Sequence, residues 1–192
     1  MDALTHAVEA YISTIATDET DALARMATAS ILRNLPIAYA EGSNLEARER
    51  MAVASCMAGL AFTRAGVGYV HAVAHQLGGL YHVPHGLANA IVMPQILDFS
   101  KSHCAHRLAD LARVSGIGNA GASETELADA FIAQIRKMHA DMQIPQVVKE
   151  LQRNDFDKII DRAFAEAHGT YGVPRYMTRA DATALLERLM PK

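Results

Sequence analysis

Residues 68–97 read GYVHAVAHQLGGLYHVPHGLANAIVMPQIL, and this stretch contains four of the nine histidines in the 192-residue chain. Its apolar residues recur at helical spacing, so we expect a helix over 71–80 and a buried helix over 87–97. The break between them is predicted at Val83-Pro84, because the residue before a proline avoids the α region. His71 and His75 lie four residues apart, which places both imidazoles on one face of the first helix, and His85 follows the break.

A second pair of possible metal ligands lies in MDALTHAVEAY, residues 1–11. Asp2 and His6 are also four residues apart, on a helix predicted over 3–13. One carboxylate and three imidazoles, from Asp2, His6, His71 and His85, form a donor set that suits Fe(II) or Zn(II). The alternative is that these histidines are hydrogen-bonded pairs in the core or on the surface. Neither pair is a closed zinc pattern, and the sequence contains no HExxH.

The remainder of the chain shows helical periodicity and no strand alternation, which predicts an all-α fold. Ser123 with Glu126, and Thr178 with Asp181, are typical of capping boxes at helix starts. Pro94 is predicted to bend or end the helix that contains it. Further helices are expected at about 18–39, 44–64, 102–114, 123–142, 147–152, 156–167 and 178–190.

Composition excludes several classes of function. The formal charge of −3, the pI of about 6.3 and the absence of a basic stretch give no reason to expect nucleic acid or an anionic membrane as partner. Two cysteines, Cys56 and Cys104, give no disulfide framework. No apolar run reaches the ~18 residues of a membrane helix, and the start of the chain lacks the cationic region of a secretory signal. We therefore expect a soluble cytoplasmic protein.

DALTHAVEAY at 2–11, followed by AGLAFTRAGVGYVHAVAHQLGGLYHVPHGLANAIVMPQIL at 58–97, strongly resembles the iron-containing (group III) alcohol dehydrogenases. The resemblance implies the C-terminal helical domain of that family, which is of the dehydroquinate synthase-like type. It implies that Asp2, His6, His71 and His85 bind the metal. It also implies that His75 takes part in proton transfer and that Phe62 lines the substrate pocket.

The family resemblance also implies partners and cofactors. Full members have an N-terminal domain that binds NAD(P), but this sequence has no GxGxxG or GGGS-like loop and no alternating strands and helices. We therefore expect residues 1–192 to be a single helical metal-binding domain, without the nucleotide-binding domain and inactive alone. NAD(P) is expected only with that missing domain. The further expected partners are a small alcohol or aldehyde and a second copy of the chain.

The implied function is the metal-binding catalytic half of an NAD(P)-dependent alcohol dehydrogenase, in which the metal is the Lewis acid. Two alternatives stay open. One is a redox-inactive metal-binding helical protein, and the other is a half-enzyme that needs a separate nucleotide-binding chain. Gln76 and the sequence GVPR at 172–175 depart from the commoner pattern of the family, so no particular alcohol is predicted.

The other histidines are predicted to have no functional role. We expect His82 to form part of the pocket wall without binding metal. Four histidines in polar stretches are predicted to be solvent-exposed: His103, His106, His139 and His168.

Overall fold

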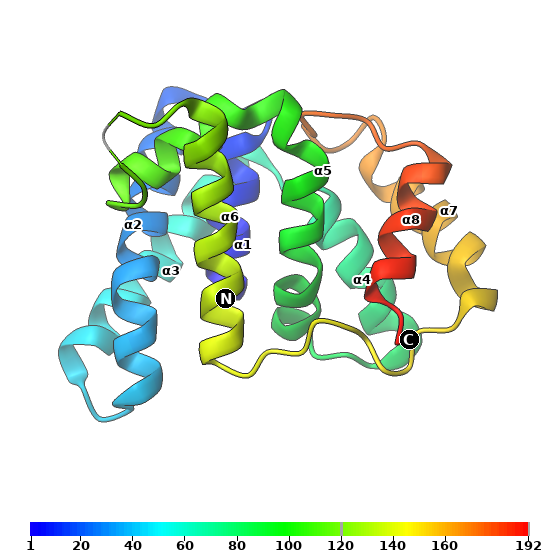
Figure 1. Ribbon diagram of the computed structural model, residues 1–192, viewed down its shortest axis with the longest axis horizontal. Helices are drawn as coiled ribbons and strands as arrows, with labels where there is room; N and C mark the ends of the chain where they lie inside the picture. The colour runs from blue at the N-terminus through cyan, green and yellow to red at the C-terminus, as the bar shows by residue number, and fades with distance from the viewer. Residues whose placement is uncertain (120, 192) are drawn as a thin grey trace.

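Helices account for all regular structure in residues 1–119 and 121–191, which the computed structural model describes (Figure 1). No strand occurs in this part of the chain, which confirms the predicted all-α fold. The elements are α1 (Asp2–Ile12), α2 (Asp18–Ala40), α3 (Leu45–Ala65), α4 (Tyr69–Tyr81), α5 (His85–Val114), α6 (Glu124–Asp141), the short 3-10 helix η1 (Arg153–Asp155), α7 (Phe156–Ala167) and α8 (Arg179–Leu189).

Helix starts follow the side chains that can cap them. The predicted capping boxes of Ser123 with Glu126 and of Thr178 with Asp181 are both formed, at the starts of α6 and α8. Asn44 caps α3 through its side chain, which accepts the N–H of Ala47. Each such cap stabilises a helix by about 1 kcal/mol, because it satisfies a backbone N–H that has no partner within the helix.

Two helix predictions were wrong. The predicted helices over 87–97 and 102–114 both lie within α5, and the kink between its two helical parts is at Cys104 (φ −137°, ψ 24°). Pro94, which was predicted to bend or end its helix, instead lies inside α5 with helical geometry on both sides. The apolar residues around Pro94 are almost fully buried, and their burial offsets the roughly 3 kcal/mol that a proline costs inside a helix. The predicted helix at 147–152 is absent. Val148 instead donates its backbone N–H to the carbonyl of Leu189, so contact with the end of α8 overrides local helix preference.

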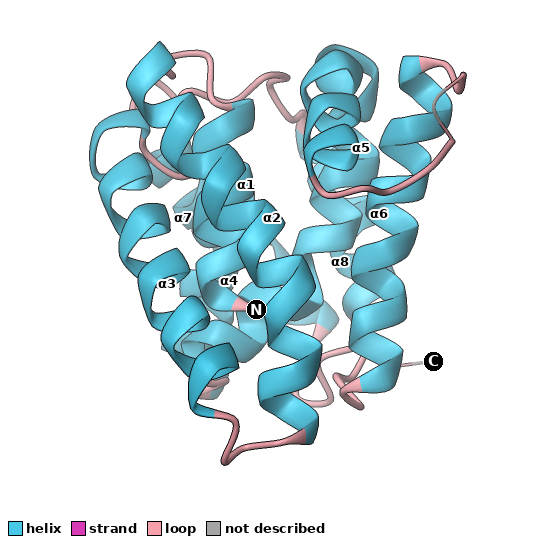
Figure 2. Cartoon of the chain, turned by 90° about the vertical axis from the view of Figure 1, so that its left-hand side faces the viewer, coloured by secondary structure: helices cyan, strands magenta, loops and turns pink. Residues whose placement is uncertain are grey.

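The helices pack in two groups around α5. α1 lies against α2 and α3 on one side, where Ala7, Ala27 and Ala58 bring the three helices close together. α4 packs against both α5 and α7 on the other side, and α6 lies along α5. Figure 1 shows α5 between α6 and the pair α7–α8, and Figure 2 shows the same packing turned by 90°. α5 contacts both α1 and α4, so it connects the two groups.

The length and apolar content of the described helices decide whether any could cross a membrane. No one of them is both long and apolar enough to cross a bilayer. α3 and α4 reach that length and apolarity only as a pair, and they meet at a bend of 103°.

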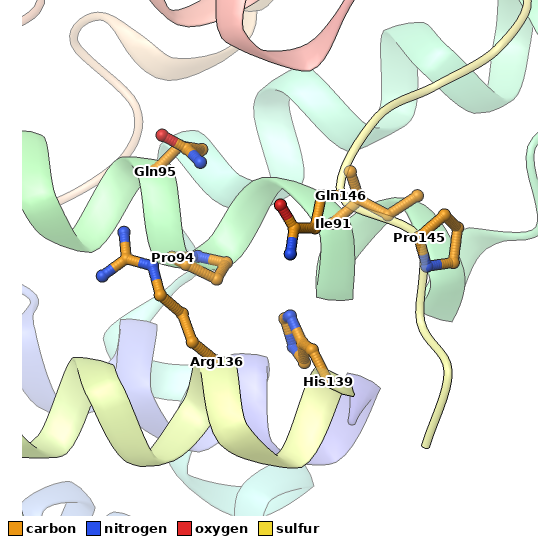
Figure 3. Close-up of a pocket in the computed structure, with 7 residues that line it drawn as sticks. All are labelled: Ile91, Pro94, Gln95, Arg136, His139, Pro145 and Gln146. Carbon is orange, nitrogen blue, oxygen red and sulfur yellow. The ribbon is translucent and has the colours of Figure 1, made fainter. Parts of the chain in front are cut away.

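The exposure predicted for His139 was wrong, whereas His103, His106 and His168 are exposed as expected. His139 lies on α6 with 6% of its surface exposed, and its Nε2 has no hydrogen-bond partner among the described residues. Figure 3 shows it facing a small cavity lined by α5, α6 and the segment that follows α6. The volume of this cavity is about 80 Å³. The side chains of Arg136 and Gln146 also line this cavity. Burial first, and then the positive charges of the Met1 amino group and Arg136, lower the pKa of His139 to about 4.

We expect His139 to make the fold acid-sensitive. Its folded-state pKa lies below the ordinary 6.5, so the unfolded chain binds the proton more tightly. The contribution of the neutral His139 side chain to the free energy of unfolding is complete above pH 6.5 and is lost as the pH falls toward 4. By pH 5 the loss should be about 2 kcal/mol, at 1.36 kcal/mol for each pH unit. Urea unfolding of wild type and of His139→Phe measures it, since the variant keeps an aromatic ring and cannot titrate.

The matched control for the His139 prediction is His106→Phe at an exposed position, which should keep the pH dependence of wild type. An identical pH dependence of unfolding in wild type and His139→Phe would show that other groups cause the acid sensitivity.

Candidate metal centre

Three histidine side chains from three helices converge at one site that runs from the buried His71 to the exposed His85. His6 lies on α1, His71 on α4, and His85 is the first residue of α5. One ring nitrogen from each lies within 4.8 Å of those of the other two. The ring centroids of His6 and His71 are 4.3 Å apart, and those of His71 and His85 are 5.4 Å apart. The structure therefore brings together three of the four predicted ligands as one compact group.

The sequence HVPHG makes the turn that brings His85 back to His71. His82 ends α4 in the left-handed conformation (φ 57°, ψ 27°), and Pro84 stands immediately before α5. The chain therefore reverses within three residues, and the first side chain of α5 faces the preceding helix. His82 itself is exposed, and its predicted place in a pocket wall remains an expectation.

Asp2 borders the histidine group. Its Oδ1 lies 3.5 Å from Nε2 of His85, and its Oδ2 lies 3.6 Å from Nδ1 of His6. Ligands held about 2.1 Å from a tetrahedral ion are separated from each other by roughly 3.4 Å. The spacing of Asp2 and His85 matches this value, and one carboxylate with three imidazoles is a normal donor set for Fe(II) or Zn(II). The residues present therefore fit a divalent metal.

Glu9 is a functional candidate that the sequence reasoning missed. It lies on α1 with 3% of its surface exposed. Its Oε2 lies 2.6 Å from Nδ1 of His71, and its Oε1 accepts the backbone N–H of Val70 at 2.7 Å. A carboxylate here accepts the Nδ1–H of His71 and leaves Nε2 unprotonated, as a metal ligand requires. Gly68 leaves room for this contact, because a Cβ there would lie 2.8 Å from Glu9 Oε1.

His6 is oriented in a similar way. Its Nδ1 lies 3.1 Å from the backbone carbonyl of Asp2, to which the Nδ1–H donates, so Nε2 is left to face the group. Burial, followed by the neighbouring His71, lowers the pKa of His6 and favours the neutral imidazole. The ring of Phe62 on α3 stacks at a tilt of 33° on His6, with centroids 4.2 Å apart. Phe62 is therefore next to the candidate metal centre, while its contact with a substrate remains an expectation.

His75 lies at the exposed edge of the group. Its ring stacks on His85 with centroids 5.3 Å apart, and its Nδ1 lies 2.6 Å from Oε1 of Glu166 on α7. Tyr171 donates its hydroxyl to the same oxygen at 2.6 Å, and Gln76 donates its amide to Oε2 at 3.3 Å. Burial and the Glu166 carboxylate raise the pKa of Tyr171, so its hydroxyl stays protonated as a donor. Four side chains thus fix one orientation of His75.

Glu166 and Tyr171 were not predicted from the sequence. Their positions lie 91 and 96 residues beyond His75, and no spacing rule connects residues at that distance. Glu9 left a usable signal, because it is a carboxylate three residues after His6, on the helix face that also carries Asp2.

Comparison with known proteins gives a consistent result along almost the entire chain. The model of a family described as "Fe-containing alcohol dehydrogenase family, C-terminal" matches residues 1–190. A 1,3-propanediol dehydrogenase of Klebsiella pneumoniae is 43% identical over 190 residues, which are 98% of this chain and 49% of that protein. An NADPH-dependent butanol dehydrogenase of Clostridium saccharobutylicum is 38% identical over 193 residues, covering 97% of this chain and 48% of that protein.

Solved structures agree with the sequence comparison. A crystal structure of 1,3-propanediol oxidoreductase superimposes with a TM-score of 0.93 at 43% identity, over 98% of this chain and 50% of the other. An alcohol dehydrogenase from Oenococcus oeni has the same TM-score at 34% identity, again over 98% of this chain and 50% of the other. The chain thus spans about half the length of the relatives that it matches.

Proposed function

This chain belongs to the Fe-containing alcohol dehydrogenase family, and on that premise we propose that it forms the metal-binding catalytic half of an NAD(P)-dependent alcohol dehydrogenase. The proposed reaction interconverts an alcohol and an aldehyde or ketone. The observation that carries the proposal is the convergence of His6, His71 and His85 with Asp2 at their border. We further propose that the 192 residues act as one helical domain and that the nicotinamide is bound by the part of the relatives that this chain does not match.

The four candidate ligands would hold Fe(II) or Zn(II) through Nε2 atoms and a carboxylate oxygen. Such an ion, when bound, supplies Lewis acidity to the oxygen of the substrate. Glu9 keeps His71 in the tautomer that coordinates, and Phe62 shields one side of the centre with an apolar ring.

His75 is the proposed proton carrier. A neutral His75 donates its Nδ1–H to Glu166 and therefore presents an unprotonated Nε2. That nitrogen can accept the proton of a substrate hydroxyl during oxidation and return it during reduction. The partly exposed position of His75 lets the proton pass on to water, while the buried His71 has no such route.

The test is a fusion of the unmatched half of the Klebsiella pneumoniae 1,3-propanediol dehydrogenase to this chain, assayed with short alcohols and Fe(II) or Zn(II). We expect NAD(P)-linked oxidation by the fusion and none by the 192-residue chain alone. The matched control is the same fusion with His75→Ala, which keeps the candidate ligands. It should bind metal normally and lose roughly 100-fold or more in kcat, since general acid–base groups contribute 10²–10⁴-fold. A folded, metal-bound fusion without turnover would favour the redox-inactive alternative.

A further inference from the structure

The Asp2 carboxylate has little support from its own helix. Asp2 is the first residue of α1, where the start of the helix has no side-chain cap, and 41% of its side chain is exposed. The nearby nitrogens of His6 and His85 lie 3.5 to 3.6 Å away, beyond normal hydrogen-bond length. A carboxylate in this position needs another group to fix its direction.

Asn89 provides that group from α5. It lies one turn after His85 and is fully buried. Its Nδ2 donates to Oδ1 of Asp2 at 2.7 Å and lies 3.0 Å from Nε2 of His85 and 3.1 Å from Nε2 of His71. The shortest and only charge-assisted contact is the one to Asp2.

Of the two possible orientations of the Asn89 amide, the contact with Asp2 selects the one observed. Its Oδ1 is buried and has no hydrogen-bond partner among the described residues. An unsatisfied buried acceptor costs about 1–3 kcal/mol of folding stability. An apolar side chain at position 89 would avoid this cost, so the amide is expected to have a role that offsets it. The reversed amide would place Oδ1 against the carboxylate of Asp2. The observed orientation is therefore the one that holds Asp2.

The first turn of α5 is shaped to receive Asp2. A Cβ on Gly86 would lie 3.2 Å from Cβ of Asp2 and 3.8 Å from its Cγ, so the glycine permits this close approach. The positive end of the α5 dipole also favours a carboxylate beside its first residues. Gly86 and Asn89 thus both contact the same Asp2 side chain from the first turns of α5.

We propose that Asn89 is a positioning residue for Asp2, which it holds toward the metal through the Nδ2–H to Oδ1 hydrogen bond without being a ligand itself. The inference rests on the proposed function, because it assumes that Asp2 and the three histidines bind a divalent ion. With a metal bound, the Nε2 atoms of His71 and His85 would serve the ion, and the Asn89 amide would keep its hydrogen bond to Asp2. Removing a residue that hydrogen-bonds to a metal ligand typically lowers metal affinity by about 10–100-fold.

The experiment measures Co(II) and Zn(II) affinity by calorimetry for the 192-residue chain as wild type, Asn89→Leu, Asp2→Ala and the double variant. Leu has the same branched side-chain skeleton as Asn, with two methyl groups in place of the amide O and N, and it removes the unsatisfied Oδ1. Helical circular dichroism of the variant shows whether the larger side chain is accommodated. We expect Asn89→Leu to weaken binding about 10–100-fold and to shift the visible absorption of bound Co(II). In the Asp2→Ala background the same change should have no further effect.

Several outcomes would overturn the proposal. Unchanged or tighter binding by Asn89→Leu would show that the amide does not support Asp2 in the loaded protein. Equal weakening with and without Asp2 would show that Asn89 acts through the histidines or through packing. If Asn89→Leu fails to fold, Asn89→Ala answers the same question. Absence of metal binding by wild type would instead reject the proposed function.

Discussion

Replacing His71 or His85 with alanine is expected to abolish stoichiometric binding of Fe(II) or Zn(II). Each change removes one of the four proposed ligands, and His71 is buried, so no water or neighbouring donor easily takes its place. Calorimetry or metal analysis after dialysis measures the loss of metal affinity. We expect this loss to exceed the roughly 100-fold decrease that follows removal of a residue that only hydrogen-bonds to a ligand. The matched control is His82→Ala, which removes an exposed imidazole from the same segment and should leave affinity unchanged. Full affinity in both His71→Ala and His85→Ala would reject these residues as ligands.

The second large effect is expected at Glu9. Glu9→Ala leaves the Val70 N–H and the His71 Nδ1–H buried without acceptors, and each such group costs about 1–3 kcal/mol. It also frees His71 to change tautomer, which should weaken metal binding by about 10–100-fold. Urea unfolding and metal titration of the same preparation measure both losses.

Glu9→Gln separates the two roles of Glu9. The amide oxygen can accept from His71 or from Val70 but not from both, so we expect intermediate stability and intermediate metal affinity. Glu46→Ala, at an exposed position on α3, is the control and should change neither quantity. A Glu9→Ala protein with wild-type metal affinity would show that packing alone orients His71.

Glu166, which orients His75, also contacts one of the residues that depart from the commoner family pattern. Gln76 departs from the commoner pattern of the family, and the structure shows its amide on Glu166, the carboxylate that holds His75. Tyr171, just before the GVPR sequence, contacts the same carboxylate. Gln76 therefore contacts the carboxylate that orients the proposed proton carrier, and GVPR directly follows a second residue that contacts it.

The elements that the sequence predicted are those encoded within one or two helical turns. The caps at Ser123 and Thr178 and the break before His85 depend on neighbours three or four residues away, so local chemistry decides them. The spacing of Asp2 with His6 and of His71 with His75 placed the candidate ligands on helix faces for the same reason. The family resemblance then indicated which of these side chains to group together.

Tertiary packing decided the rest. Glu9 lies 62 residues from His71, Asn89 lies 87 from Asp2, and Glu166 lies 91 from His75, and each pair meets only after different helices pack. The continuity of α5 through Pro94 and the burial of His139 likewise depend on neighbouring helices. Thus the sequence by itself determined which residues could be ligands and which segments are helical, because those properties are local. Only the tertiary structure determined which second side chain orients each ligand, because burial and hydrogen-bond partners arise from contacts distant in the chain.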